Sequence, residues 1–269
     1  MCQTIAATNG GFMEQILKGK RALITGGDSG IGYAVAEVYA DAGADLVICA
    51  RNAEKLANSE QSLLEKGVRV KALQCDVEYP EQCQQVVRKA EEFLGGVDIL
   101  ANVAGISPKK EGGMKLPFWE ISDSQWQQVI DVNLNSMFYF EKAVAPGMIR
   151  QKYGRIINMS SVVGLTNSEH GPASACYSVS KRGAIGLTKA TAFELAPYNI
   201  TVNAVAGGRI TTAMSAANNS YYNDLHSKLI PMKRFGTTRE VAMAFLYYAS
   251  PDAGYVTGDV MNITGGWFL

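Results

Sequence analysis

Residues 22–32, Ala-Leu-Ile-Thr-Gly-Gly-Asp-Ser-Gly-Ile-Gly, decide the fold that this sequence predicts. An apolar run at 22–25 predicts a strand, and an amphipathic helical pattern follows at 31–41. Glycines at such a turn let the backbone approach a pyrophosphate, whose charge is favourable at a helix N-terminus. The stretch therefore predicts a nucleotide site. A glycine-rich turn without a ligand is the alternative.

The spacing of these glycines narrows the class of nucleotide site. Gly26, Gly30 and Gly32 give G-x3-G-x-G, which differs from the commoner G-x-G-x-x-G dinucleotide fingerprint. No Gly-Lys-Ser/Thr follows, so a P-loop is excluded.

Strand and helix patterns alternate along the rest of the chain, and the strand candidates are apolar throughout. Such strands are buried on both faces, which is typical of a parallel sheet with helical crossovers. We predict strands at 22–25, 46–50, 68–74, 99–103, 155–159, 201–205 and 260–263. We predict helices at 31–41, 53–66, 80–94, 123–151, 177–196 and 238–250. The fold class is α/β, a single doubly wound, Rossmann-like domain with a parallel seven-stranded sheet and helices on both faces.

Domain organisation follows from the same pattern. Residues 1–17 are expected to be an N-terminal arm, and 18–269 one domain that carries both the cofactor and the substrate sites, with a lid at about 212–235. The longer irregular stretches, 106–121 and 213–235, follow strand ends, where such sheets bind ligands.

Composition excludes several function classes. The 269 residues contain 25 Lys and Arg and 25 Asp and Glu, which leaves no basic field for nucleic acid or an anionic membrane. No apolar run approaches a bilayer-spanning length, and the first residues do not form a secretory signal. The five cysteines are scattered and the two histidines stand alone, so no metal site or disulfide framework is expected. A cytoplasmic protein is the expectation.

Arg51 and Asn52 end the second predicted strand, about 20 residues after the glycines. A fold that prefers NAD has an Asp or Glu there for the ribose 2′-hydroxyl, whereas a guanidinium suits a 2′-phosphate. NADP(H) is therefore the preferred cofactor and NAD(H) remains possible. A solvated arginine is the other interpretation of Arg51.

Tyr177 and Lys181 lie four residues apart in a helical pattern, so they share a helix face. An adjacent ammonium favours phenolate and would lower the pKa of Tyr177 toward the range of a general acid–base. Taken alone, such a pair is usually an ordinary surface contact.

Three motifs in order make the chain resemble a short-chain dehydrogenase/reductase. They are Thr25-Gly26-x3-Gly30-x-Gly32, Asn102-Val103-Ala104-Gly105 and Tyr177-x3-Lys181, and the resemblance extends from Lys18 to the C-terminus. Asp76, Asn133, Ser161 and the ending Thr257-Gly258-Asp259 to Gly265-Gly266 add to it.

The resemblance implies four catalytic residues. Tyr177 would exchange a proton with the substrate oxygen, and Ser161 would hydrogen-bond the substrate carbonyl. Lys181 would hold the nicotinamide ribose and lower the Tyr177 pKa, while Asn133 would hold a water linking Lys181 to solvent. Ser160 is interpreted as structural. Two hydroxyl donors aimed at an oxygen that becomes negative would stabilise the developing charge.

The resemblance also implies binding residues. The cofactor would contact Gly26, Asp28, Ser29, Gly30, Ile31, Gly32, Arg51, Asn52, Asp76, Val77, Asn102, Ala104, Gly105, Tyr177, Lys181, Gly208, Ile210 and Thr212. The substrate would contact Ser161, Val163, His170, Tyr177, Gly208 and Met214. A solvated histidine is the alternative for His170. The lysines at 109, 110 and 115 could contact an acidic substrate, but a charged surface loop is the preferred interpretation.

Two features depart from the family pattern. Ser161 and Tyr177 are sixteen residues apart, so residues 167–173 are expected to bulge toward the substrate. Gly207-Gly208 stands where the family usually has Pro-Gly, which loosens the backbone around the nicotinamide pocket.

The sequence thus predicts an NADP(H)-preferring oxidoreductase that interconverts a small or medium carbonyl compound and its alcohol. The alternatives are a non-catalytic nucleotide-sensing or scaffold protein and an epimerase or dehydratase on the same fold. The resemblance implies a homo-oligomer, a tetramer or a dimer, joined through the helices at 123–151 and 177–196. The apolar tail 266–269 is expected to pack near a neighbouring subunit.

Overall fold

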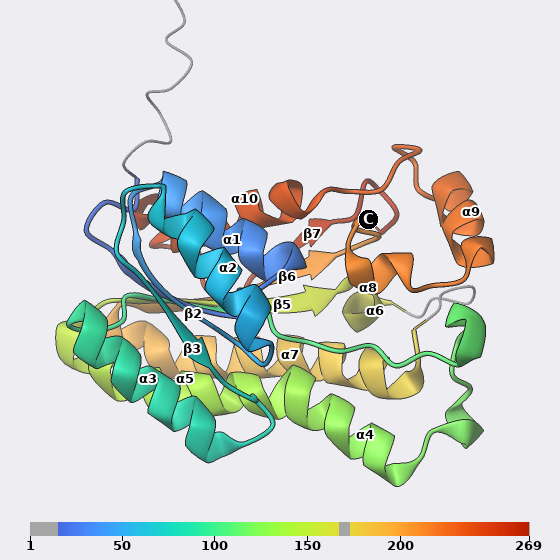
Figure 1. Cartoon of the computed structure of the whole chain (residues 1–269), viewed down its shortest axis with the longest axis horizontal. Helices are drawn as coiled ribbons and strands as arrows, with labels where there is room; N and C mark the ends of the chain where they lie inside the picture. Colours follow the sequence, from blue (N-terminus) through green and yellow to red (C-terminus); the bar gives the residue numbers. More distant parts are fainter. Residues whose placement is uncertain (1–15, 167–172, 269) are drawn as a thin grey trace, which may run out of the picture.

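The structure is a computed structural model that describes residues 16–166 and 173–268. Within these ranges the strands form one parallel sheet of seven strands in the order β3-β2-β1-β4-β5-β6-β7 (Figure 1). The strands are β1 (Arg21–Thr25), β2 (Asp45–Ala50), β3 (Val70–Gln74), β4 (Ile99–Asn102), β5 (Gly154–Ser161), β6 (Ile200–Gly207) and β7 (Val260–Ile263). The predicted fold class is confirmed.

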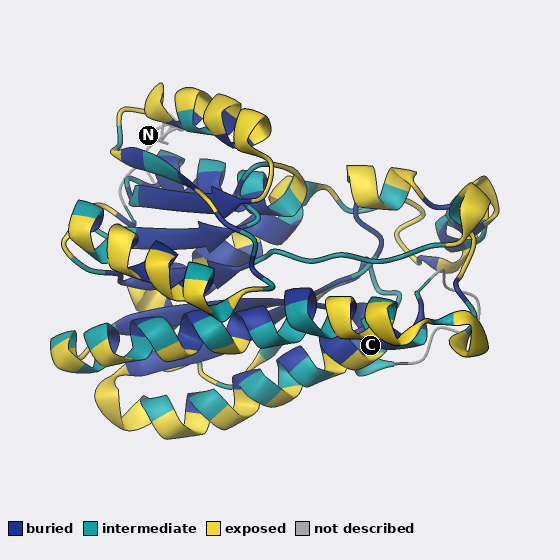
Figure 2. Cartoon of the chain, turned by 60° about the horizontal axis from the view of Figure 1, so that its bottom comes forward, coloured by how far each residue is buried: buried dark blue, intermediate teal, exposed yellow. Residues whose placement is uncertain are grey.

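Helices cover both faces of the sheet (Figure 1). One face packs against α1 (Gly30–Asp41), α2 (Ala53–Leu64) and α10 (Thr238–Ala249). The other packs against α3 (Pro80–Leu94), α5 (Ser136–Gln151) and α7 (Ala175–Leu195). The inner strands β2 and β4 lie between two helical layers and bury nearly all of their side chains, whereas the edge strands β3 and β7 are only partly buried. Figure 2 shows the buried strands inside a shell of helices exposed on their outer sides.

The predicted helix at 123–151 is interrupted. The chain forms α4 (Asp123–Ile130), a π-helical turn (Asp131–Asn135) and then α5. Ser122 caps α4 in a reciprocal pair with Gln125, which explains why the helix begins there. The π turn carries Asn133, and such turns are frequent at functional sites.

Short helices that the sequence did not predict lie at one end of the molecule. They are α6 (Val162–Leu165), α8 (Ala213–Ala216) and α9 (Ser220–Leu229). α8 and α9 form most of the predicted lid at 212–235, and Asn219 caps α9 by accepting from the Tyr221 N–H. In Figure 1 they lie at the carboxyl ends of the strands.

The domain begins inside the predicted arm. Leu17, the last residue of the arm as predicted, is fully buried, and its N–H donates to the Ala42 carbonyl. The structure does not describe residues 1–15. In the described ranges no helix is long and apolar enough to cross a membrane.

Candidate active site

The turn between β1 and α1 has no room for side chains at two of its glycines. Gly26 adopts φ +69°, and a Cβ on Gly32 would lie 2.0 Å from the Gly26 carbonyl oxygen. Ser29, which precedes α1, makes no capping bond, so its side chain leaves the N–H groups of the first helical turn unoccupied. A cradle of free N–H groups at a helix N-terminus fits a pyrophosphate.

Thr25 joins this turn to the loop after β4. Its hydroxyl oxygen accepts from the N–H groups of Val103 and Ala104, at 2.9 and 3.1 Å. The glycine-turn pocket, about 230 Å³, lies between the two segments and extends to Tyr177, Lys181 and Thr212. The predicted cofactor residues 26, 28–32, 104 and 105 line it.

A second cavity, the Arg51 pocket, continues from the first, with which it shares Gly26, Asp28, Ser29, Ala104 and Gly105. Arg51, Asn52, Asp76 and Val77, which the sequence analysis assigns to cofactor binding, also line it. The Arg51 guanidinium is half-exposed and lies 3.9 Å from a Glu78 carboxylate oxygen.

Two of the predicted cofactor residues have structural roles. Asn52 caps α2, because its side-chain oxygen accepts from the Lys55 N–H at 2.9 Å. Asn102 lines neither of these pockets, and its side chain is buried beneath the loop, where it donates to the Asn158 side chain at 2.9 Å.

Tyr177, Ser161 and Lys181 meet where the end of β5 packs against α7. The Ser161 hydroxyl lies close enough to the Tyr177 phenol to lower the pKa of that phenol, and both residues line the same cavity. Lys181 is buried, with Nζ 5.7 Å from the centre of the Tyr177 ring. Ser160 has the structural role predicted for it, because its hydroxyl donates to the Lys181 carbonyl at 2.8 Å and ties β5 to α7.

The expected lowering of the Tyr177 pKa is wrong for the protein without a bound cofactor. Burial raises the pKa of Tyr177 above its ordinary value, and the nearby Ser161 hydroxyl opposes this only in part. Lys181 Nζ donates to the Met159 carbonyl at 2.8 Å, and burial lowers its own pKa to about 8. The sequence argument missed the cost of burial, which acts on both groups.

Asn133 is fully buried and holds the loop after β4. Its Oδ1 accepts from the Ile106 N–H at 2.8 Å, and its Nδ2 donates to the Ile106 carbonyl and the Ser180 hydroxyl. The π turn thus directs this amide between the loop and α7.

A third cavity, the Ser161 pocket, has a volume of about 140 Å³ and shares Tyr177 with the glycine-turn pocket. The predicted residues Ser161, Val163, Tyr177, Gly208 and Met214 line it. Ile210 and Thr212, predicted to contact the cofactor, line it as well. His170 and most of the predicted bulge at 167–173 lie outside the described residues.

Lys109 and Arg209 also line the Ser161 pocket. The sequence analysis considered Lys109 only as the less favoured contact for an acidic substrate, and it did not identify Arg209. Lys109 differs from the exposed Lys110 and Lys115 because it is only partly exposed and lines this pocket. Its side chain is partly buried, and burial, followed by the nearby positive charge of Arg209, lowers its pKa to about 8. Arg209 directly follows the Gly207-Gly208 pair that borders the predicted nicotinamide pocket, and this position could have identified it as a site residue.

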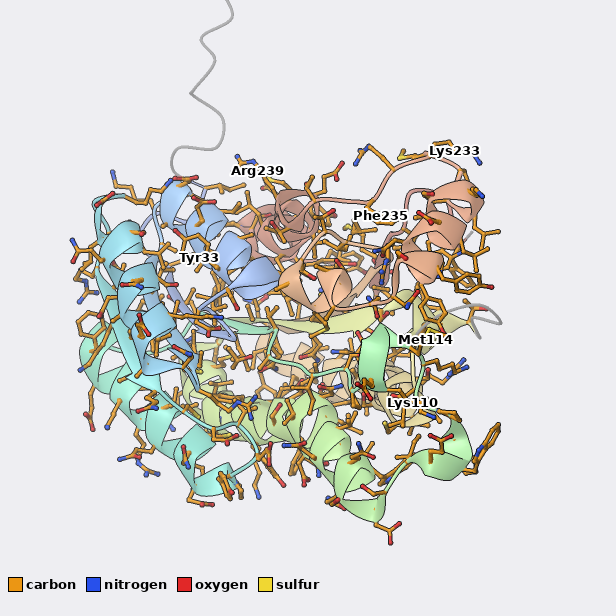
Figure 3. All side chains as sticks on the ribbon, turned by 45° about the vertical axis from the view of Figure 1, so that its right-hand side comes forward. Tyr33, Lys110, Met114, Lys233, Phe235 and Arg239 are labelled. Atoms are coloured by element: carbon orange, nitrogen blue, oxygen red, sulfur yellow. The ribbon has the colours of Figure 1, made fainter. Side chains whose placement is uncertain are left out.

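The C-terminal tail lies against its own chain. Trp267 lines the Ser161 pocket, and its ring centre is 4.6 Å from that of the buried His226 on α9. Trp267 is thus part of this pocket, and the packing of the tail near a neighbouring subunit stays a prediction. Met114, in the loop after β4, and Phe235, in the segment after α9, lie at this same end of the molecule (Figure 3).

Glu141, on α5, lines none of the three pockets and is almost fully buried. Its Oε1 accepts from the Asn158 side chain at 2.7 Å. Burial raises the pKa of Glu141 to about 7, and the hydrogen bond from Asn158 opposes this. Among the described residues, no group of three or more His, Cys, Asp or Glu is arranged to hold a metal ion.

Comparison with known proteins identifies the same architecture. A family model described as enoyl-(acyl carrier protein) reductase matches residues 26–268. The 3-oxoacyl-[acyl-carrier-protein] reductase FabG of Aquifex aeolicus is 37% identical over 257 residues, which are 95% of this chain and 100% of that protein.

Two solved structures are similar to the whole chain or nearly so. A 3-oxoacyl-[acyl-carrier protein] reductase from Brucella melitensis with bound NAD has a TM-score of 0.88 and 33% identity, covering 100% of this chain and 99% of that one. A short chain dehydrogenase from Burkholderia cenocepacia in complex with NADP has a TM-score of 0.85 and 29% identity, covering 94% and 99%.

Proposed function

The chain belongs to the short-chain dehydrogenase/reductase family of nicotinamide-dependent oxidoreductases, and on this premise we propose that it interconverts a small or medium ketone and the corresponding secondary alcohol. The observation that carries the proposal is the position of Tyr177, whose side chain lines both the glycine-turn pocket and the Ser161 pocket. A proton donor in that wall reaches a substrate oxygen beside a bound nicotinamide.

The chemistry follows from the side chains at this wall. The nicotinamide group supplies or accepts the hydride when it is bound. During reduction, the Tyr177 phenol donates its proton to the carbonyl oxygen, and the Ser161 hydroxyl donates a hydrogen bond to the same oxygen. The two donors stabilise the negative charge that develops there. During oxidation, Tyr177 accepts the proton from the alcohol.

Lys181 and Asn133 support the wall that contains Tyr177, between the glycine-turn pocket and the Ser161 pocket. The ammonium of Lys181, held by the Met159 carbonyl, borders the glycine-turn pocket, where it is placed to bind the ribose hydroxyls. Asn133 is proposed to position Ile106 and Ser180 through its three hydrogen bonds. These bonds use both N–H groups of the amide and one of the two acceptor positions of Oδ1, so the side chain has this positioning role, and the water-binding role implied by the resemblance stays a prediction.

NADP(H) is the proposed preferred cofactor. Arg51 borders the pocket that would hold the adenosine ribose, and among the described residues its ion-pair partner, Glu78, is at the long distance of 3.9 Å. A 2′-phosphate would give the guanidinium a closer, bidentate partner.

The reaction is tested by the consumption of reduced nicotinamide over a panel of carbonyl compounds, with NADPH and NADH in parallel. The panel includes simple ketones, oxo acids and 3-oxoacyl thioesters, because the Aquifex aeolicus relative is named as a 3-oxoacyl-[acyl-carrier-protein] reductase. Reduction of at least one compound, lost in Tyr177→Phe, supports the proposal. Cofactor binding without turnover of any compound would instead favour a nucleotide-sensing protein.

We also propose a homo-oligomer, a tetramer or a dimer, joined through α4, α5 and α7. These helices expose large apolar side chains, Trp126, Phe138, Val179 and Phe193, of which Phe193 is 86% exposed. Light scattering at micromolar concentration tests this, and a monomer would contradict it. Phe193→Asp, compared with Tyr255→Asp at another exposed site, should weaken the assembly selectively.

A further inference from the structure

Two cationic side chains lie together in the wall of the Ser161 pocket. Arg209 comes from the loop after β6 and Lys109 from the loop after β4. Both line the cavity that Ser161 and Tyr177 also line. Their positive charges are close enough for Arg209 to lower the pKa of Lys109.

Arg209 is only 9% exposed and has no ion pair within the described part of the chain. Its Nη2 donates to the Ser215 carbonyl and to the Asn223 side chain, while Nε is buried without an acceptor. The guanidinium lies over the Phe235 ring, 5.5 Å from its centre. These contacts fix its orientation, but none of the partners that the structure describes carries a negative charge.

Lys109 adds a second donor on the same cavity. Its Nζ donates to the Ser107 hydroxyl at 2.8 Å, which holds the ammonium at the pocket wall. None of the described residues that line the pocket is acidic.

A buried guanidinium such as that of Arg209 is costly, because it is desolvated and lies near the positive charge of Lys109. A ligand that carries a negative charge would offset this cost. A guanidinium in particular matches the two oxygens of a carboxylate. The small volume of the cavity favours a compact anion.

We propose that the Ser161 pocket binds a substrate that carries a carboxylate as well as the reacting carbonyl, with Arg209 and Lys109 recognising the carboxylate. This rests on the proposed function and names its substrate class: short oxo acids in the direction of reduction and the corresponding hydroxy acids in the direction of oxidation. Arg209 is then a specificity-determining residue.

The kinetic test compares short 2-, 3- and 4-oxo acids with their methyl esters, which keep the carbonyl and lose the charge. The wild type should use at least one acid ~10-fold or more better than its ester, judged by kcat/KM. Arg209→Gln should lower kcat/KM for that acid by about 30-fold or more and change that of the ester little. Arg209→Lys, which keeps the charge, should recover part of the preference.

Arg234→Gln is the matched control. Arg234 lies in the segment after α9, pairs with Glu240 and does not line the pocket, so its loss changes the net charge equally. It should leave the preference for the acid unchanged. Equal use of acids and esters by the wild type, or an equal loss for both in Arg209→Gln, would overturn the inference.

A binding measurement decides the matter if no acid or ester is reduced. Calorimetric titration of the NADP⁺-saturated protein with short saturated carboxylates should show ~10-fold or tighter binding than with the matching amides, and Arg209→Gln should remove the difference. No difference in the wild type would overturn the inference. Carboxylate binding through Arg209 without turnover of any carbonyl compound would refute the proposed function alone. Tyr177-dependent reduction of neutral ketones without any preference for acids would refute the carboxylate site alone.

Discussion

The Nζ of Lys181 donates a 2.8 Å hydrogen bond to the backbone carbonyl of Met159, in the strand that ends at Ser161. This bond joins α7 to β5 beneath the Tyr177 ring and holds the ammonium at the glycine-turn pocket. Lys181 is therefore both a tie between two elements and a charge beside the cofactor site.

Replacing Lys181 by Met should reduce both turnover and cofactor affinity. The change removes the proposed ribose contact and the charge that favours the Tyr177 phenolate, so the alkaline limb of any remaining activity should move to higher pH. Fluorescence titration with NADPH and the pH profile of alcohol oxidation measure the two effects. Lys189→Met, on the exposed side of the same helix, is the control. Unchanged cofactor affinity would contradict the ribose contact.

Tyr177→Phe should separate chemistry from binding. The ring stays, but the transferable proton is lost, so turnover should fall by ~10²–10⁴-fold. Affinity for NADPH should barely change, because most contacts lie in the glycine-turn and Arg51 pockets. Initial rates and the same fluorescence titration test this. Near-full turnover in the variant would refute the proposed mechanism.

Arg51→Asp should shift cofactor preference from NADPH toward NADH. An aspartate repels a 2′-phosphate and can accept from a ribose hydroxyl, for a total swing of ~1–3 kcal/mol. The ratio of kcat/KM for the two cofactors is the measurement. Lys55→Asp, at an exposed position on α2 outside the Arg51 pocket, gives the same charge change as a control. A wild type that already prefers NADH would show the assignment to be wrong.

Glu141 should make stability depend on pH. Its folded pKa is raised to about 7, so the folded state binds a proton more tightly than the unfolded state does. Stability is then highest below the ordinary carboxyl pKa, falls as pH rises toward about 7 and changes little above it. Glu141→Gln should remove this slope and stabilise the protein above pH 7 by up to about 3 kcal/mol.

Urea unfolding of the wild type and the variant across this pH range measures the effect. Glu194→Gln replaces an exposed carboxylate on α7 and is the control. An unchanged slope in Glu141→Gln would mean that another group sets the pH dependence.

The fold and the nucleotide end of the site were predictable because they depend on local patterns. The strand, glycine turn and helix at 22–41 are contiguous, and Tyr177 and Lys181 are joined by helical spacing alone. Whether a loop cation such as Arg209 or Lys109 is solvated or buried depends on how two distant loops pack. No periodicity in the sequence encodes that packing. The π turn at Asn133 was not predictable either, because its sequence has the pattern of an ordinary helix.

The parallel sheet also orders the events by which this site can form. The bonds from Val103 and Ala104 to Thr25 already span 78 and 79 residues, and the wall that contains Tyr177 and Arg209 needs β5 and β6 in addition. Contacts between distant segments form only after long loops have closed, and loop closure costs conformational entropy. We therefore expect refolding to be slow. During synthesis, the first 105 residues can supply the turn for the pyrophosphate, whereas the acid–base residues follow only with the second half of the chain. After denaturation, the rate at which NADPH binding recovers and the rate at which turnover recovers thus report on the formation of two different parts of one site.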